Sequence, residues 1–307
     1  MAFLYALPGA VAEGLIWGLM AIGVYISYKI LDIADLTVDG SICTGACVCA
    51  VLLGLGVPVW ICVPVAFLAG ALAGIVTGLL HTGLGIPSIL AGILTQLMLY
   101  SVNLVILGGK SLMAVDHRAN TLLVHMSNNP LSIVAMVAMV AVTIVILWLF
   151  FYTEVGLTLK STGDNPDMSR AQGVDVNRNK VIGLAIANGI VAMAGAMLAQ
   201  YKGSANINDG RGAIVIALAA IFIGLSVSLK IKPNFVVSLI GVVSGGVVYY
   251  IVYNFVILLG LKTDYLKMLS AIIVALFLGI PYVKAQYFTK QKAPQPSTQQ
   301  AGGKADA

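Results

Sequence analysis

Three hydrogen-bonding side chains, Gln96, Tyr100 and Asn103, interrupt the apolar stretch 87–108 at intervals of four and three residues. That spacing places them on one face of a helix. Amide and phenol groups can donate and accept hydrogen bonds, so these side chains could line the path of a polar solute through a membrane. The alternative for each of them is hydrogen bonding between neighbouring membrane helices, which uses the same residue types.

Further polar side chains lie within other apolar stretches. Asn188 and Gln200 belong to the stretch 180–200, and the same two roles are open to them. The stretch 234–260 adds Tyr249, Tyr250, Tyr253 and Asn254. Aromatic side chains along a path would suit an apolar or aromatic solute, whereas tyrosines near the end of a span equally serve as membrane-surface anchors.

The segment 154–180 is a polar island with eight charged residues, Glu154, Lys160, Asp164, Asp167, Arg170, Asp175, Arg178 and Lys180. Its residues predict a short helix. Asn165 can accept hydrogen bonds from the free N–H groups at the start of a helix, and Pro166 suits the first helical position. Gly173 is placed to adopt the left-handed conformation that closes such a helix.

This predicted helix is about two turns long, which is too short to be stable alone in water. It therefore needs a surface on which to dock. Met168 and Ala171 are three residues apart and share a face, so they could supply contacts to a soluble partner. The alternative is an ordinary solvated loop between two membrane helices.

Motifs for chemistry are absent from the sequence. It contains no phosphate-binding GxxxxGK[ST], no His-Glu-x-x-His and no GxSxG. If the protein transports a solute actively, we therefore expect its energy to come from an ion gradient or from a separate ATPase.

The carboxylates lie at the ends of the predicted spans, at Glu13, Asp32, Asp35, Asp39, Asp209 and Asp264. An ion-coupled carrier needs ionisable groups within its spans, so this placement disfavours such a carrier and favours a partner ATPase. Glu13 is an exception, because it lies inside the first apolar stretch. The four cysteines, Cys43, Cys47, Cys49 and Cys62, are predicted to act as small apolar residues, and no metal site is expected.

The composition requires a membrane. The 307 residues are 60% hydrophobic and 9% charged, against about 25% charged in soluble domains, and the mean hydropathy is +0.99. We predict an all-α, polytopic transmembrane helical bundle of about nine spans. Apolar windows of about 20 residues place them at roughly 7–28, 38–56, 58–80, 87–108, 131–152, 180–200, 211–229, 234–260 and 266–284.

The basic residues predict the orientation. With 154–180 on the cytoplasmic side, 11 Lys and Arg fall inside and 6 outside, as cytoplasmic loops prefer. The net charge of +5 is scattered over loops, so no nucleic-acid partner is expected. The predicted organisation is a membrane domain over 1–285 and a disordered cytoplasmic tail over 286–307.

Two parts of the chain echo each other. Tyr28-Lys29 precedes Asp39-Gly40 and a span rich in small residues, and Tyr201-Lys202 precedes Asp209-Gly210 and another such span. The two units begin five predicted spans apart, so they would have opposite orientations, as in the inverted repeats of transporters. Chance similarity between two glycine-rich helix pairs is the alternative.

Several of these segments together resemble the permeases of ABC importers of the branched-chain amino acid and ribose type. They are GLIWGLMAIGVYISYKILDIADLTVDGSICTGA, SILAGILTQLMLYSVNLVILGG, LKSTGDNPDMSRAQGV and AIANGIVAMAGAMLAQYKGSANINDGRGAIVIALAAIFIG. The third resembles the segment through which such permeases meet their ATPase, and the positions that match are Lys160, Gly163, Asn165, Pro166, Ala171 and Gly173. The resemblance is greatest to a subgroup linked in part to uptake of tryptophan or other aromatic amino acids.

The resemblance implies partners and a location. It implies two copies of an ABC ATPase subunit, which hold the ATP and Mg²⁺, a second and identical permease chain, and an extracellular substrate-binding protein or lipoprotein. The implied location is the bacterial plasma (inner) membrane, where lipid surrounds the protein. It also implies that residues 160–173, with Met168 and Arg170 among them, contact the ATPase. The chain itself would be no enzyme and hold no cofactor. Import of a sugar or nucleoside and ion-coupled transport are the alternatives to amino acid import.

Overall fold

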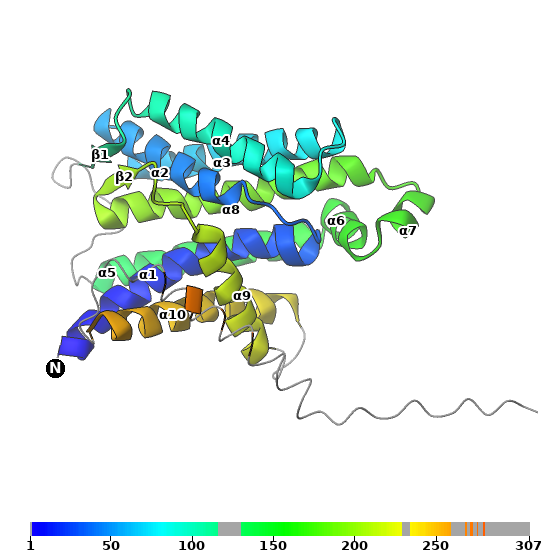
Figure 1. The fold of residues 1–307 in the computed structure, drawn as a ribbon. Helices are drawn as coiled ribbons and strands as arrows, with labels where there is room; N and C mark the ends of the chain where they lie inside the picture. Colours follow the sequence, from blue (N-terminus) through cyan, green and yellow to red (C-terminus); the bar gives the residue numbers. More distant parts are fainter. Residues whose placement is uncertain are drawn as a thin grey trace, which may run out of the picture.

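The computed structural model describes residues 2–115, 130–228 and 234–258, together with Met268, Ala271, Ile272, Ala275 and Gly279. Its elements, in chain order, are α1 (Ala2–Tyr25), the π-helical η1 (Ile26–Ile30), α2 (Val38–Gly54), α3 (Val59–Thr82), α4 (Ser88–Ile106), β1 (Leu112–Ala114), α5 (Pro130–Phe151), α6 (Glu154–Asp164), α7 (Pro166–Ala171), α8 (Val176–Lys202), β2 (Ser204–Asn206), α9 (Ala213–Ser228) and α10 (Phe235–Leu258). Most of them form one helical bundle, from which α6 and α7 project at one end (Figure 1).

The described residues contain six helices that are long and apolar enough to cross a membrane, namely α1 with η1, α3, α4, α5, α8 and α10. Two shorter apolar helices, α2 and α9, lie where two further spans are predicted, and the total of about nine spans stays a prediction. A 17-residue helix is about 25 Å long, which is less than the roughly 30 Å of a bilayer core. The predicted span 266–284 and the predicted tail 286–307 lie outside the described ranges, apart from the few single residues named above.

Helix α8 is the centre of the bundle. It packs antiparallel to α3, where Gly70 lies against Asn188 and Gly74 lies against the Leu184 carbonyl. It also packs against α2, where Gly45 lies against Ala192. A Cβ atom at any of these three glycines would overlap the α8 backbone or a side chain on it, so the small residues allow the close helix contacts that are typical of membrane bundles.

Residues 31–37, which lead from η1 into α2, have no regular structure, and every second side chain from Leu31 to Thr37 is buried in the protein. Ile33, Asp35 and Thr37 are all at most 5% exposed. Irregular backbone at membrane depth is tolerated only where protein covers it and its polar groups are satisfied. This segment therefore explains how a helix as short as α2 can take part in crossing the bundle.

A buried polar network fixes this segment. Asp35 accepts hydrogen bonds from the Thr37 N–H at 2.9 Å and from Asn188 Nδ2 at 2.6 Å. The Asn188 Oδ1 atom in turn accepts from Ser41 Oγ at 2.6 Å, and the hydroxyls of Thr37 and Thr77 lie 2.7 Å apart. The network joins α2, α3 and α8 through residues far apart in the sequence.

Asp35 corrects one expectation. We predicted it at the end of a span, but it is 2% exposed and lies against the middle of α8. The sequence could not place it there, because the segment that carries it is neither a span nor a surface loop.

The second short helix, α9, begins against the first turn of α2. Asp39, in the first turn of α2, accepts hydrogen bonds from the N–H groups of Gly212 and Ile214, both at 2.9 Å. The Gly210 N–H lies 3.1 Å from Cys43 Sγ. A side chain from one short helix thus caps the other, which satisfies N–H groups that would otherwise have no partner.

The two echoing units share an order of elements. In each, a long helix is followed by a non-helical segment and then by a short apolar helix. The long helices α1 and α8 run antiparallel, since Tyr201 contacts Gly9 and Ala187 contacts Gly23. The inverted repeat itself remains a prediction.

The expected all-α class omits one feature, a two-stranded antiparallel ribbon. Strands β1 and β2 pair Leu112 with Asn206 and Ala114 with Ser204. The ribbon lies at the end of the bundle opposite α6 and α7, which we call the ribbon end (Figure 1). Both strands are only three residues long, so no alternating pattern marks them in the sequence.

We expect Asn188→Leu to destabilise the bundle by about 3 kcal/mol, because it leaves the buried Asp35 carboxylate and the Ser41 hydroxyl without this partner. Thermal unfolding of the detergent-solubilised protein would measure the effect. The matched control is Asn177→Leu on the same helix, where the residue is exposed and a change below about 0.5 kcal/mol is expected. Equal unfolding temperatures for the two variants would contradict the structural role of the network.

Candidate functional site

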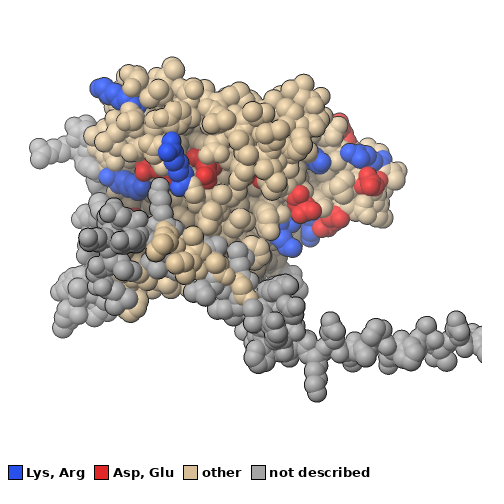
Figure 2. Space-filling view, viewed as in Figure 1, with Lys and Arg blue, Asp and Glu red and all other residues tan. Residues whose placement is uncertain are grey.

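Helices α6 and α7 form a charged projection at one end of the molecule. On the face shown in Figure 2, blue and red side chains gather over this projection and, in a smaller group, toward the ribbon end, with an uncharged surface between them. An uncharged belt between two charged ends is the distribution that a membrane-spanning protein requires.

The structure contains the short helix predicted within 154–180. Asn165 caps α7 by accepting a hydrogen bond from the Met168 N–H at 3.0 Å, and Pro166 is the first helical residue. Gly173 has a φ of +81°, and the Val174 N–H bonds back to the Ser169 carbonyl at 3.0 Å. These contacts close both ends of a helix of only six residues.

The outer face of α7 has no partner within the described chain. Met168 is 60% exposed, Ala171 is exposed, and Arg170 pairs only with Asp167 in the same helix, at 3.3 Å. Exposed pairs of this kind stabilise a protein little. Lys160, on the neighbouring helix α6, is exposed as well. An exposed methionine beside charged side chains therefore leaves a surface free for another protein.

The inner face of α7 is joined to the bundle through α6, a helix that we did not predict. Ser169 is buried and lies 2.8 Å from Ser161 Oγ, and Thr162 accepts a hydrogen bond from Asn179 Nδ2 at 3.0 Å. Gly163 packs against the carbonyl of Ile30 in η1, where any Cβ atom would overlap it. The projection is thus connected to α8 and to the start of the buried segment 31–37.

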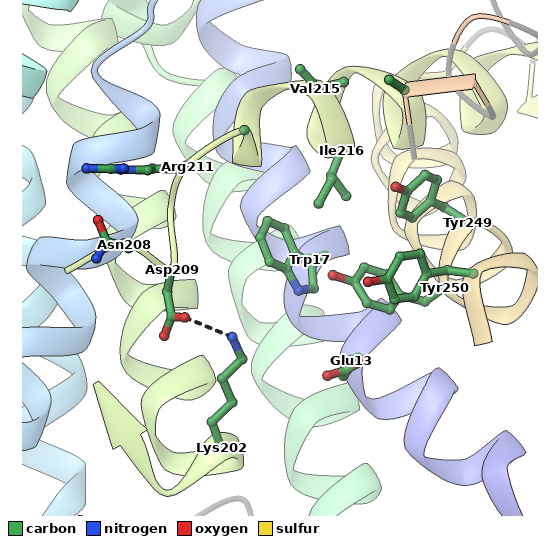
Figure 3. A pocket seen from close by; sticks show the side chains of 13 residues that line it. Glu13, Trp17, Lys202, Asn208, Asp209, Arg211, Val215, Ile216, Tyr249 and Tyr250 are labelled. Atoms are coloured by element: carbon green, nitrogen blue, oxygen red, sulfur yellow. Dashed lines mark hydrogen bonds and ion pairs between the residues drawn. The ribbon is translucent and has the colours of Figure 1, made fainter. Parts of the chain in front are cut away.

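A cavity of about 480 Å³ lies between α1, α8, α9 and α10 (Figure 3). We call it the aromatic cavity, and its main lining residues are Glu13, Trp17, Lys202, Asp209, Arg211, Tyr249, Tyr250 and Tyr253. Small-molecule sites in proteins have volumes of about 300–1,000 Å³. The cavity is therefore large enough for a small solute.

Its aromatic wall depends on close packing of α1 against α10. Gly14 lies so close to Val247 that a Cβ atom would come within 2.6 Å of the Val247 Cα atom. This contact brings Trp17 onto Tyr250, with ring centroids 5.9 Å apart and an interplanar angle of 22°. Tyr253 lies 5.6 Å from the Tyr250 ring and extends the wall.

The charges around the aromatic cavity are unevenly paired. Lys202 and Asp209 form an ion pair at 3.2 Å, drawn as a dashed line in Figure 3. Within the described part of the chain, the carboxylate of Glu13 and the guanidinium of Arg211 form no ion pair. Figure 3 shows Glu13 beneath the aromatic rings and Arg211 pointing away from them.

A second cavity of about 470 Å³, the amide cavity, is lined by the three residues predicted to share a helix face, Gln96, Tyr100 and Asn103. Asp39 and Arg211 also line it, so Arg211 lines both cavities. Asn103 is 1% exposed, and its Oδ1 atom has no hydrogen-bond partner among the described residues. A buried acceptor without a donor is costly, so water or a solute donor is expected there.

The other two predicted path residues lie in neither cavity. Asn188 belongs to the network around Asp35. Gln200 is fully buried, and its Nε2 atom donates to the Ala196 carbonyl at 3.3 Å and to Cys49 Sγ at 3.7 Å. Their contacts with Asp35, Ser41 and Cys49 are of the interhelical kind that the alternative expects, and a role in the solute path stays a prediction for both. The four cysteines are buried and free, and no metal-binding cluster occurs among the described residues.

Sequence reasoning singled out some residues of the aromatic cavity without bringing them together. Glu13 was noted as a charge within an apolar stretch, and the tyrosines of 234–260 as polar groups. Their meeting depends on the antiparallel contact of α1 with α10. The glycines that permit it, Gly14 and Gly18, are a signal that can be read only when the partner helix is known.

Comparison with known proteins places these features in a family. The profile described as "Branched-chain amino acid transport system / permease component" matches residues 9–278. A tyrosine transport system permease protein of Clostridioides difficile (strain R20291) is 36% identical over 268 residues, which are 87% of this chain and 88% of that protein. The ribose import permease protein of Escherichia coli (strain K12) is 24% identical over 244 residues, 79% of this chain and 75% of that protein. No solved structure gives a significant match.

We expect Asn165→Ala to loosen α7 by about 1 kcal/mol, because the Met168 N–H loses its acceptor. Hydrogen exchange measured on a peptide that covers 165–173 should become about fivefold faster. Asn165→Ser, which keeps a capping oxygen, is the matched control and should exchange nearly as the parent chain does. Unchanged exchange in the alanine variant would show that the cap does not hold the helix.

Proposed function

The chain belongs to the family of branched-chain amino acid transport system permease components, and we propose that it forms the membrane path of an ATP-driven importer for an amino acid with an aromatic side chain. Permeases of this family are transport components of the bacterial inner membrane and not catalysts. The single observation that supports coupling to an ATPase is the capped helix α7, which is held from inside by Ser169 and bare outside at Met168.

The proposed mechanism starts at this projection. A soluble ATPase subunit binds the exposed face of α7 on the cytoplasmic side, with one ATPase subunit for each of two permease chains. Because Gly163 packs on η1 and Thr162 bonds Asn179, a displacement of α7 acts on α8 and on the segment 31–37. ATP and Mg²⁺ belong to the partner, and this chain transmits movement without binding either.

The solute class is proposed from the similarity to the tyrosine permease, which is greater than that to the ribose permease. The lining of the aromatic cavity agrees with this choice. Import of a sugar is the second candidate, favoured by the ribose relative alone. We further propose that a second, identical permease completes the path and that an extracellular binding protein or lipoprotein delivers the solute.

Ion-coupled transport is disfavoured by the state of Asp35. Although this carboxylate is buried, it already accepts hydrogen bonds from Thr37 and Asn188, as a structural group does. An ion-coupled carrier would need a carboxylate poised to bind and release its ion, which Asp35 is not, so that role would fall to Glu13 in the aromatic cavity.

Contact with the ATPase predicts a charge-reversal effect at α7. The variant Met168→Glu/Arg170→Glu/Ala171→Glu should reduce co-purification of the ATPase subunit about tenfold or more, since it places unpaired negative charge in the proposed interface. Leu55→Glu is the control, because it adds an exposed charge at the ribbon end. Assembly and uptake at parental levels in the triple variant would refute the coupling role of α7.

The solute class predicts selective stimulation of the assembled importer. In liposomes that hold the permease, the ATPase and the binding protein, radiolabelled L-tyrosine should accumulate and stimulate ATP hydrolysis, whereas D-ribose should do neither. Collapse of the ion gradients at constant ATP should leave uptake unchanged. Accumulation of ribose, or loss of uptake with the gradients, would favour the corresponding alternative.

A further inference from the structure

The geometry of the aromatic cavity points to a binding site for a zwitterionic aromatic amino acid, in which Glu13 binds the α-ammonium group, Lys202 binds the α-carboxylate and the Trp17–Tyr250 wall binds the ring. This assignment rests on the proposed function and adds the residues that recognise the solute. It concerns a site of passage on the permease itself, distinct from the site of any binding protein.

The carboxylate of Glu13 is the proposed partner of the α-ammonium group. It lies on a helix that is otherwise apolar around it, between Ala12 and Gly14, and it faces the cavity beneath the tyrosine rings (Figure 3). Within the described residues it has neither an ion pair nor a hydrogen bond to its carboxylate. A half-buried carboxylate without a cation is unfavourable, so the cavity is complementary to a solute that brings a positive charge.

The ammonium group of Lys202 is the proposed partner of the α-carboxylate. Its ammonium group bonds Asp209 through one contact at 3.2 Å, and an ammonium has three donors, so two remain for a solute. Lys202 and Glu13 line the same cavity (Figure 3). One side of the cavity therefore offers an unpaired anion beside a cation with free donors, which is the arrangement that an amino acid's two charged groups require.

The aromatic wall is the proposed contact surface for the solute ring. Trp17 and Tyr250 are stacked 5.9 Å apart, and both rings lie above Glu13 in Figure 3. The Tyr253 ring, 5.6 Å from that of Tyr250, also lines the cavity. Offset stacking with a solute ring stabilises it beyond the burial of its area. The α-ammonium would also lie near the faces of these rings, where a cation is attracted.

The same arrangement predicts which solutes are disfavoured. A sugar has no charge, so it would leave Glu13 without a cation. An aromatic acid that lacks the amino group would bring a second carboxylate next to Glu13 and would be repelled. An aromatic amine that lacks the carboxylate keeps the contact with Glu13 and loses only that with Lys202.

Tryptophan fluorescence can report on the site, because Trp17 lines the cavity while the other two tryptophans, Trp60 and Trp148, are 70% and 40% exposed elsewhere. In a Trp60→Phe/Trp148→Phe background, Trp17 is the single reporter. The purified full chain would be titrated with L-tyrosine, with tyramine and with 3-(4-hydroxyphenyl)propionate. The order expected for affinity is tyrosine, then tyramine, with the propionate weakest.

Two substitutions give a crossed test. Glu13→Gln should weaken both tyrosine and tyramine by about 10- to 100-fold, as expected for loss of one charged hydrogen bond. Lys202→Gln should weaken tyrosine in the same range and leave tyramine unchanged. Glu154→Gln is the matched control, because it changes the other glutamate of the chain, which is exposed at the opposite end.

Each result decides between the claims. If both variants bind all ligands more weakly to the same extent, the cavity is generally disturbed and the assignment of charges is overturned. Parental affinity for tyrosine in Glu13→Gln would overturn it as well. The liposome measurement with the complete importer tests the proposed binding site separately from the proposed function. If tyrosine is imported with an unchanged KM by Glu13→Gln, the site is wrong and the proposed function stands. If no amino acid is imported, the proposed function itself fails.

Discussion

The structure depends on one constraint, that the irregular segment 31–37 must satisfy its polar groups inside an apolar protein. Asp35, Asn188, Ser41 and the two threonines do so with hydrogen bonds of 2.6–2.9 Å. Because these bonds reach α2, α3 and α8, the segment cannot be removed from the interior without leaving several buried groups unpaired. The positions of the short helix α2 and of everything packed on it follow from this network.

The two ends of the bundle are linked through this interior. At one end, Gly163 rests on the carbonyl that closes η1, directly before the buried segment. At the other, Asp39 in the first turn of α2 caps α9, whose first turn borders the aromatic cavity, and Arg211, just before α9, lines both cavities. A continuous series of contacts therefore runs from the docking helix α7 to the residues that line the cavities. Every contact in it is made by a polar group or by a glycine at a close approach, and such contacts have few alternative arrangements.

Local features of this protein were predictable from the sequence, and non-local ones were not. The apolar stretches predicted helices for the spans within the described chain, and the capping signals at Asn165, Pro166 and Gly173 predicted α7, because these depend on neighbours within a few residues. The burial of Asp35 depends on Asn188, and the aromatic cavity depends on the meeting of Glu13 with Lys202 and Tyr250. The ribbon and α6 escaped prediction for a different reason. The strands are very short, and the polar surface of α6 resembles that of a loop.

The separation of Asp35 from Asn188 along the chain has a consequence for biogenesis. The two residues are 153 positions apart, so Asp35 leaves the ribosome long before its partner exists. The apolar helices α1 to α5 must therefore enter the bilayer while that carboxylate still lacks its amide donor, and a hydrophobic helix with a nearby acidic group inserts poorly on its own. Insertion of α8, which brings Asn188 to Asp35, then completes assembly. A chain truncated before α8 would be a substrate for membrane quality control.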